Sequence, residues 1–124
     1  MTVEKKQTNR LRKNIVNAIK DIKGLNIISL NLIDIEEAIC KYFIICTGSS
    51  NTHVNSIEKN IKKKVKESPW KTEGKTNTNW ILMDYIDIVV HIFSKEKREF
   101  YKLEELWGDA KITKHRDYTK IKTA

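Results

Sequence analysis

Residues 79–107 have the sequence NWILMDYIDIVVHIFSKEKREFYKLEELW, and this stretch decides the fold. Two apolar runs, Trp80 to Tyr85 and Ile88 to Phe93, lie on either side of Ile86-Asp87. Runs that are this short and rich in β-branched and aromatic side chains favour strands over helices. Because only two residues separate the runs, they are predicted to form a β-hairpin.

The alternation of side chains along each strand divides the predicted hairpin into two faces. One face is wholly apolar, with the cross-strand pairs Tyr85–Ile88, Met83–Val90 and Ile81–Ile92. The other, the mixed face, carries the pairs Asp84–Val89, Leu82–His91 and Trp80–Phe93. Its residues are too apolar for a solvent-exposed face and too polar for a core. We therefore expect the mixed face to be covered, either by helices of the same chain or by a partner.

Composition narrows the class of protein. The chain has 124 residues with one proline and four glycines, which fits a single domain. No apolar run approaches the roughly 20 residues that a membrane span needs. The formal net charge of +8 favours contact with anionic polymers such as RNA. The charged N-terminus lacks the apolar core of a secretory signal, and Cys40 and Cys46 are too few for a disulfide framework, so we expect a cytoplasmic protein.

The rest of the chain is predicted to place helices and strands around this hairpin. In order, the predicted elements are a helix from Thr8 or Asn9 to Gly24, a strand over 26–32, a strand over 41–47, a helix over 51–67, a short strand over 70–74 and a final helix capped by Ser94. The strand over 26–32 is expected at a sheet edge, whereas the apolar run over 41–47 indicates a central strand. The final helix is expected to bury Phe100, Leu103, Leu106 and Trp107. Residues 1–107 form the predicted domain, and residues 108–124 a basic, partly disordered tail.

Lysines recur at helical spacing along the outer face of the helix over 51–67. They are Lys59, Lys62, Lys63 and Lys66. This spacing favours a solvated surface, and weak nucleic-acid binding is the alternative.

The turn Gly48-Ser49-Ser50 is a candidate phosphate site, because it follows an apolar strand and precedes a helix. Capping of that helix by one of the serines or by Asn51 is the interpretation that we favour. A nucleotidyltransferase would also need paired carboxylates on a neighbouring strand to hold Mg²⁺, and no D-x-D sequence follows.

Asp84, Asp87 and His91 are the remaining candidates for acid–base or metal chemistry. The register directs Asp84 to the mixed face, whereas Asp87 falls in the turn, where aspartate is common because it forms local hydrogen bonds. His91 has no second ligand at motif spacing, so a hydrogen-bonded or partner-facing histidine is favoured over a zinc ligand. The aromatic residues nearby suit a protein-binding site and a core equally.

Four motifs in the same order resemble the ribosomal silencing factor (RsfS, Iojap, YbeB) family over residues 11–107. They are YFIICTGSS at 42–50 followed by HV at 53–54, WILMDY at 80–85, DIVVHIF at 87–93 and REFYKLEELW at 98–107. The resemblance implies an α/β fold in which helices flank a mixed β-sheet, similar to nucleotidyltransferases but without their catalytic carboxylates. It therefore implies a protein that is not an enzyme and needs no metal or cofactor.

The resemblance also implies a partner. Proteins of this family bind the large ribosomal subunit through ribosomal protein uL14, block joining of the small subunit and so repress translation. A homodimer is expected because family members are often dimeric. Apart from the resemblance, the basic surfaces and the basic tail of this chain favour rRNA as a further contact. The implied partner surface consists of Trp80, Asp84, Tyr85, His91, Arg98, Tyr101, Leu103 and Trp107.

Two features depart from the family pattern. The family usually has glycine where this chain has Ile86, and a β-branched residue tolerates positive φ poorly, so a different turn is expected. The tail after Trp107 is longer and more basic than the family requires. On the residues alone, two other functions stay open: a nucleotide-binding or nucleotidyltransferase-like enzyme that uses the Gly48-Ser49-Ser50 turn, and a generic RNA-binding domain.

Overall fold

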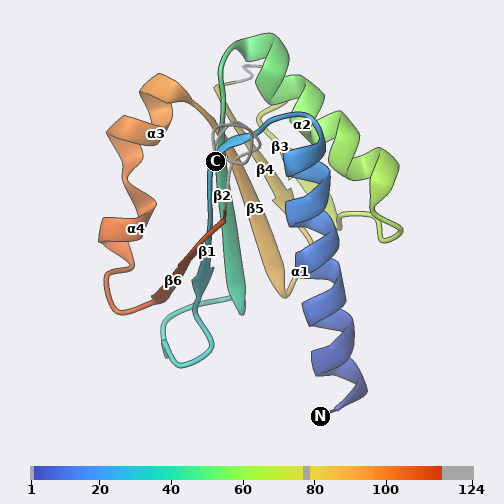
Figure 1. Cartoon of the computed structure of the whole chain (residues 1–124). Helices are drawn as coiled ribbons and strands as arrows, with labels where there is room; N and C mark the ends of the chain where they lie inside the picture. The colour runs from blue at the N-terminus through green and yellow to red at the C-terminus, as the bar shows by residue number, and fades with distance from the viewer. Residues whose placement is uncertain (1, 77–78, 116–124) are drawn as a thin grey trace, which may run out of the picture.

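The strands form one mixed sheet, and helices lie against both of its faces (Figure 1). The computed structural model describes residues 2–76 and 79–115, except for the side chains of residues 100 and 101. The helices are α1 (Val3–Asp21), α2 (Asn51–Lys64), α3 (Lys95–Tyr101) and α4 (Leu103–Leu106). The strands are β1 (Leu25–Asn31), β2 (Tyr42–Gly48), β3 (Lys71–Glu73), β4 (Trp80–Asp84), β5 (Ile88–Ser94) and β6 (Lys111–Lys114), in the spatial order β3-β4-β5-β2-β1-β6. This architecture confirms the predicted α/β fold class.

The hairpin of β4 and β5 has the predicted register. Ile81 lies opposite Ile92, and Leu82 lies opposite His91. β5 pairs in parallel with β2, which pairs antiparallel with β1 on its other side. β2 is therefore a central strand, as its continuous apolar run predicted.

On one face of the sheet α1 and α2 cover β1, β2, β4 and β5, and we call it the closed face. The apolar stripes of the two helices pack on the inward residues of β4 and β5, as the predicted apolar face of the hairpin requires. Side chains with no exposed surface here include Ile15, Ile19, Ile57, Ile61, Ile81 and Ile92. This face holds the larger of the two apolar cores.

The opposite face is covered only in part, and we call it the open face. α3 packs on β5 and β2. Together with α4 and the loop over 32–40 it buries Leu30, Leu32, Phe93 and Leu103 in a second core. Toward β4 this cover ends, and four side chains pack on the second core while staying half-exposed. They are Phe43, Trp80, Leu82 and Trp107. The chain's own helices therefore cover part of the mixed face and leave the rest accessible.

The first helix begins earlier than predicted. Its N-cap is Thr2, whose hydroxyl accepts a hydrogen bond from Lys5 N–H at 3.1 Å. Thr8, the predicted cap, lies inside α1 and donates its hydroxyl to the Glu4 carbonyl at 3.0 Å. The prediction was wrong because both threonines are good caps and the turn between them carries no apolar periodicity.

The predicted tail joins the sheet. β6 pairs antiparallel with β1, so that Thr113 lies opposite Ser29. The expectation of disorder is therefore wrong for residues 111–114, and β1 is flanked by β2 and β6 instead of lying at an edge. The other tail residues, 116–124, lie outside the described residues.

The final helix is broken at Lys102. Ser94 caps α3 as predicted, with its hydroxyl accepting from Lys97 N–H at 3.3 Å. Lys102 then has a φ of 17°, which separates α3 from α4 and changes the direction of the chain. Because of this break Leu103 is buried, but Leu106, also predicted to be inside, is 75% exposed.

Candidate functional site

Trp80 is a partly exposed aromatic side chain of the open face that the fold holds in place. Its indole stacks on Phe93 with the ring centroids 5.0 Å apart, and its Nε1 donates a hydrogen bond to His91 Nδ1 at 3.1 Å. β4 and β5 bring these side chains together because Trp80 and Phe93 are direct cross-strand partners. The indole is thus held in one orientation while half-exposed, so a partner that contacts it gains area at a low cost in conformational entropy.

His91 is the buried side chain that accepts the hydrogen bond from the Trp80 indole. It is 4% exposed and lies edge-on to Phe43, with ring centroids 4.6 Å apart. Burial lowers the pKa of His91 to about 4, so the ring is neutral at pH 7. With Nδ1 accepting from Trp80, the proton of the neutral ring sits on Nε2. His91 therefore positions Trp80 and presents almost no exposed surface of its own.

Phe43 and Trp107 continue the open face across the sheet. Their rings meet edge-on with centroids 5.9 Å apart, so that the α4 end of the chain abuts β2. Leu82 lies on the same side of the sheet, two residues along β4 from Trp80. Phe43, Trp80, Leu82 and Trp107 therefore pack on one core, and each keeps part of its apolar surface exposed.

An apolar hollow of about 280 Å³ extends the open face at the hairpin turn. Three of its lining residues are strongly exposed for their type: Ile39 at 96%, Trp70 at 68% and Ile86 at 64%. Cys40, Asp84 and Val89 complete the lining. Exposed apolar side chains gathered around one hollow are typical of an interaction surface.

The turn itself corrects an expectation. Ile86 adopts a φ of 76° although it is β-branched, and Asp87 N–H donates to the Tyr85 carbonyl at 3.0 Å across it. The chain thus keeps the left-handed conformation that a glycine would favour. Asp84 stabilises this turn, because its Oδ1 accepts from Ile86 N–H at 2.7 Å.

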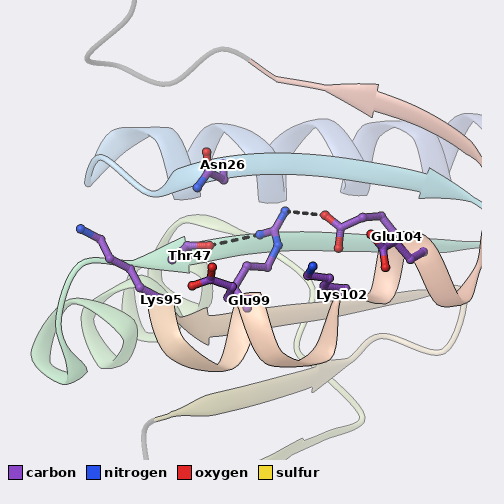
Figure 2. A pocket seen from close by; sticks show the side chains of 8 residues that line it. Asn26, Thr47, Lys95, Glu99, Lys102 and Glu104 are labelled. Atoms are coloured by element: carbon purple, nitrogen blue, oxygen red, sulfur yellow. Dashed lines mark hydrogen bonds and ion pairs between the residues drawn. The ribbon is translucent and has the colours of Figure 1, made fainter.

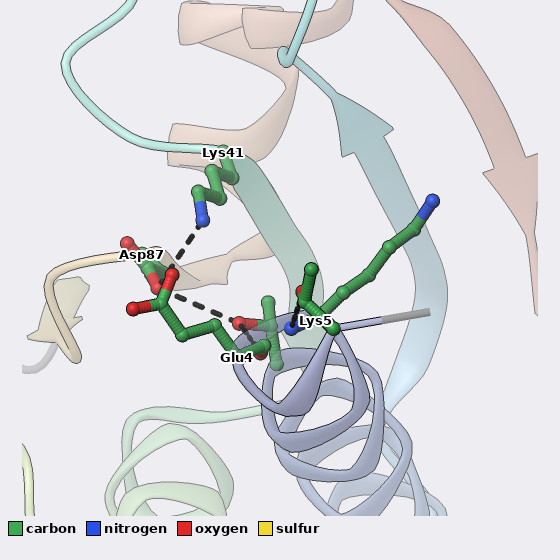
Figure 3. Close-up of polar contacts among 6 residues, drawn as sticks. Glu4, Lys5, Lys41 and Asp87 are labelled. Carbon is green, nitrogen blue, oxygen red and sulfur yellow. Dashed lines mark hydrogen bonds and ion pairs between the residues drawn. The ribbon is translucent and has the colours of Figure 1, made fainter.

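Asp87 does not form the local hydrogen bonds predicted for it. Its carboxylate lies 3.8 Å from Lys41 Nζ, and the Thr8 hydroxyl donates to it at 3.5 Å (Figure 3). Asp87 therefore links the hairpin turn to α1 and to the start of β2. The local role predicted for Asp87 belongs to Asp84.

Arg98 lines a separate pocket of about 470 Å³ beside α3. Figure 2 shows Thr47 and Glu104 in the lining of this pocket. The Arg98 guanidinium donates to Thr47 Oγ1 at 3.2 Å and to Glu104 Oε2 at 3.4 Å. The Arg98 side chain is only 13% exposed. Its charge is therefore used to hold α3 and α4 on the sheet.

The residues predicted to form one partner surface do not all lie on the same face of the structure. Trp80, Asp84 and Trp107 lie on the open face, and Leu103 lies buried beneath it. Tyr85 is 8% exposed and packs in the core of the closed face, where burial raises the pKa of its phenol to about 12, so it is no part of this surface. The Tyr101 side chain lies outside the described part of the chain.

Phe43, Ile39, Trp70 and Ile86 were not among the residues predicted for the partner surface. Phe43 lies in a run that is apolar on both faces, which gives no sign that one face is partly uncovered. Ile39 and Trp70 lie beside the strands, where the alternation of side chains does not reach. An isoleucine in a turn position was the one signal that could have pointed to the hollow.

The Gly48-Ser49-Ser50 turn caps α2. The Ser50 hydroxyl accepts from His53 N–H at 3.0 Å, and Ser49 N–H donates to His53 Nδ1 at 2.8 Å. A Cβ on Gly48 would lie 2.8 Å from Val54 N, so the glycine is required for the helix to pack on the strand. The favoured capping interpretation is confirmed at Ser50.

The lysine stripe faces solvent on the outer side of α2. Lys62 pairs with the fully buried Glu58 at 2.7 Å, and Lys75 reaches the same carboxylate at 3.6 Å. α2 ends at Lys64, so Lys66 lies beyond the helix, and Lys59 and Lys63 are exposed. The described residues contain neither a group of three potential metal ligands nor a helix long and apolar enough to span a membrane.

Comparison with known proteins gives consistent matches. A family profile described as ribosomal silencing factor during starvation, RsfS, matches residues 5–124. The ribosomal silencing factor RsfS of Halalkalibacterium halodurans is 40% identical over 77% of this chain and 83% of its own length. A mouse protein named mitochondrial assembly of ribosomal large subunit protein 1 is 35% identical over 53% of this chain and 32% of its own. A crystal structure of a Chromobacterium violaceum protein superposes with a TM-score of 0.75 at 32% identity, covering 81% of this chain and 85% of that one.

Proposed function

This chain belongs to the family of ribosomal silencing factors, and on that premise we propose that it binds the large ribosomal subunit through ribosomal protein uL14. Occupying that protein keeps the small subunit from joining, and translation is repressed. The mechanism is steric and needs no catalytic step. The name of the mouse relative, which refers to the ribosomal large subunit, supports the choice of subunit.

The observation that carries the proposal is the fixed, half-exposed indole of Trp80 on the open face. Protein interfaces concentrate their binding energy in a few aromatic side chains that sit in a well-packed setting and lose their remaining contact with water on binding. Phe43, Leu82 and Trp107 pack on the same core as Trp80 and are also partly exposed, so they would supply further apolar contacts to a partner. The open face therefore has the composition of a protein-binding hot spot.

Charged side chains at the rim of the open face help to orient the bound partner. Lys71 lies opposite Asp84 in the β3–β4 pairing, and Glu73 lies opposite Leu82, so both charged side chains border the apolar centre. Rim charges act mainly on the association rate and on the choice of partner. The partner patch is accordingly an apolar surface of uL14 bordered by charges of both signs.

Sedimentation through sucrose gradients tests the proposal. The purified full chain should migrate with free large subunits and lower the yield of joined ribosomes when small subunits are added. Migration at the top of the gradient at low salt would contradict the proposal. So would equal binding to large subunits and to joined ribosomes.

Trp80→Ala gives the matching test of the surface. The variant should lose migration with large subunits and keep the circular dichroism spectrum of the folded chain, because Trp80 is not part of the closed-face core. Asp84→Asn is the control, since an amide oxygen still accepts from Ile86 N–H. This control should weaken binding only a few-fold, with the loss largest at low salt.

A further inference from the structure

A second surface of this protein has chemistry unlike that of the open face. It is a groove of about 430 Å³ between α1 and β6, which we call the α1–β6 groove. The lining residues are Asn9, Arg12, Lys13, Val16, Ser29, Thr113 and His115. Apart from Val16 they are cations, hydroxyls, an amide and an imidazole. All of these can donate hydrogen bonds to an anion.

Two of the polar groups are held in place by the fold. The Ser29 hydroxyl, on a residue only 3% exposed, is 2.8 Å from His115 Nε2. The guanidinium carbon of Arg12 lies 4.1 Å from the centre of the Tyr42 ring, and Arg12 donates to Asn9 Oδ1 at 3.1 Å. An arginine fixed in this way loses little conformational entropy when it binds an anion.

The charged side chains that line the groove, Arg12 and Lys13, are both positive. No carboxylate lines it among the residues that the structure describes. Burial, and then the positive charges of Lys20 and Arg12, lower the pKa of His115. Arg12 and Lys13 give the α1 wall of the groove its positive charge.

We propose that the α1–β6 groove binds phosphodiester groups of RNA. Arginine, lysine and hydroxyl donors are the groups that contact phosphate oxygens in protein–nucleic acid complexes. The net charge of +8 gives the whole chain a long-range attraction to such a polymer. An open groove with cations along one wall suits a continuous backbone.

Two other charged surfaces fit an RNA backbone less well. The pocket around Arg98 contains Glu99, Glu104 and Glu105 beside its cations, so its field is mixed. The lysines of α2 stand on an outer helix face, and Lys62 is neutralised by Glu58. The other lysines on that face are single charges on flexible side chains.

The position of the groove leaves the open face available. Ser29 lies between Ile28 and Leu30, which belong to the open-face core, so its side chain points to the opposite side of the sheet. The groove is therefore on the α1 side, away from Trp80. RNA and a protein partner can be bound at the same time, and the inference does not depend on the proposed function.

Charge reversal at two exposed lysines tests the inference. Lys13→Glu lies in the groove, and Lys63→Glu is a matched control on the outer face of α2 with the same change in charge. Binding of a fluorescent short RNA duplex to the full chain is measured by anisotropy over a range of salt concentrations. Melting curves should show that both variants fold like the original, since neither side chain is buried.

Lys13→Glu should weaken RNA binding about tenfold and reduce the slope of log K against log salt by about 1, whereas Lys63→Glu should change affinity no more than about twofold. Equal losses in the two variants would overturn the inference in favour of overall charge. Failure of the original chain to bind RNA at low salt would also overturn it. Polyglutamate binding equal to RNA binding would assign the groove to acidic peptides instead. Migration of Lys13→Glu with large subunits reports separately on the proposed function.

Discussion

The closed and open faces of the sheet are built from the same strands but differ in how completely helices cover them. Along β4, Ile81 and Met83 point to the closed face and have no exposed surface, whereas Trp80 and Leu82 point to the open face and are half-exposed. Alternation along one strand therefore separates two tasks. The closed face holds the larger core, and the open face holds a smaller core with apolar side chains left partly exposed.

The largest difference in the free energy of unfolding is expected between alanine substitutions at two neighbouring positions of β4. Ile81→Ala should lower the free energy of unfolding by about 2–5 kcal/mol, because it leaves a cavity in a fully packed core. Leu82→Ala should cost only about 1 kcal/mol, because the half-exposed side chain loses less burial and leaves no closed cavity. Urea unfolding at neutral pH measures both values. Equal losses would show that the open face is as tightly packed as the closed one.

The pH dependence of stability tests the buried histidine under Trp80. The pKa of His91 is about 4 in the folded chain, against an ordinary value of 6.5, so the unfolded chain takes up this proton first as pH falls. Stability is therefore lost as pH falls from about 6.5 toward 4, and the loss from His91 between about pH 7 and pH 5 should be about 2 kcal/mol.

His91→Phe isolates this contribution. Over the same pH interval, the free energy of unfolding of the variant should fall by about 2 kcal/mol less than that of the original chain. The pKa of His115 is also lowered, but this histidine contributes equally to both proteins. Unfolding by urea at the two pH values gives the difference. An unchanged pH dependence would mean that His91 is not buried in neutral form beneath the open face.

The smallest effect concerns the turn beside the apolar hollow. Ile86→Gly should raise the free energy of unfolding by about 1 kcal/mol, because it relieves the strain of a φ of 76° at a side chain that is 64% exposed. Ile86→Ala is the control, because alanine keeps the strain and should not stabilise. If glycine stabilises while binding of large subunits weakens, Ile86 is retained in this strained turn for its contact with the partner.

Local patterns predicted the hairpin and the central strand well. The register of β4 and β5 follows from a two-residue reversal and from alternation, both of which are local properties. The same rules failed where two solutions have similar local chemistry. Thr2 and Thr8 are equally good caps, and the short strand Lys111–Lys114 carries no alternation that could mark it as a sheet member.

The candidate site was predicted only in part, because it depends on what covers each face. Trp80, Asp84 and Trp107 were assigned to a surface that the structure brings together, but Arg98 turned out to hold α3 and α4 in place. The break at Lys102 determines which residues of the final helices reach the sheet, and no local signal marks it. Exposure of Ile39 and Trp70 likewise results from tertiary packing.

The affinity for purified uL14 tests most directly the claim that the open face is the docking face. Leu82→Glu places a charge on this face where water can still reach it, and Lys59→Glu is the control on the outer side of α2. By isothermal titration calorimetry, Leu82→Glu should weaken binding at least about a hundredfold, and Lys59→Glu by no more than about threefold. Equal affinities of the two variants would contradict the account.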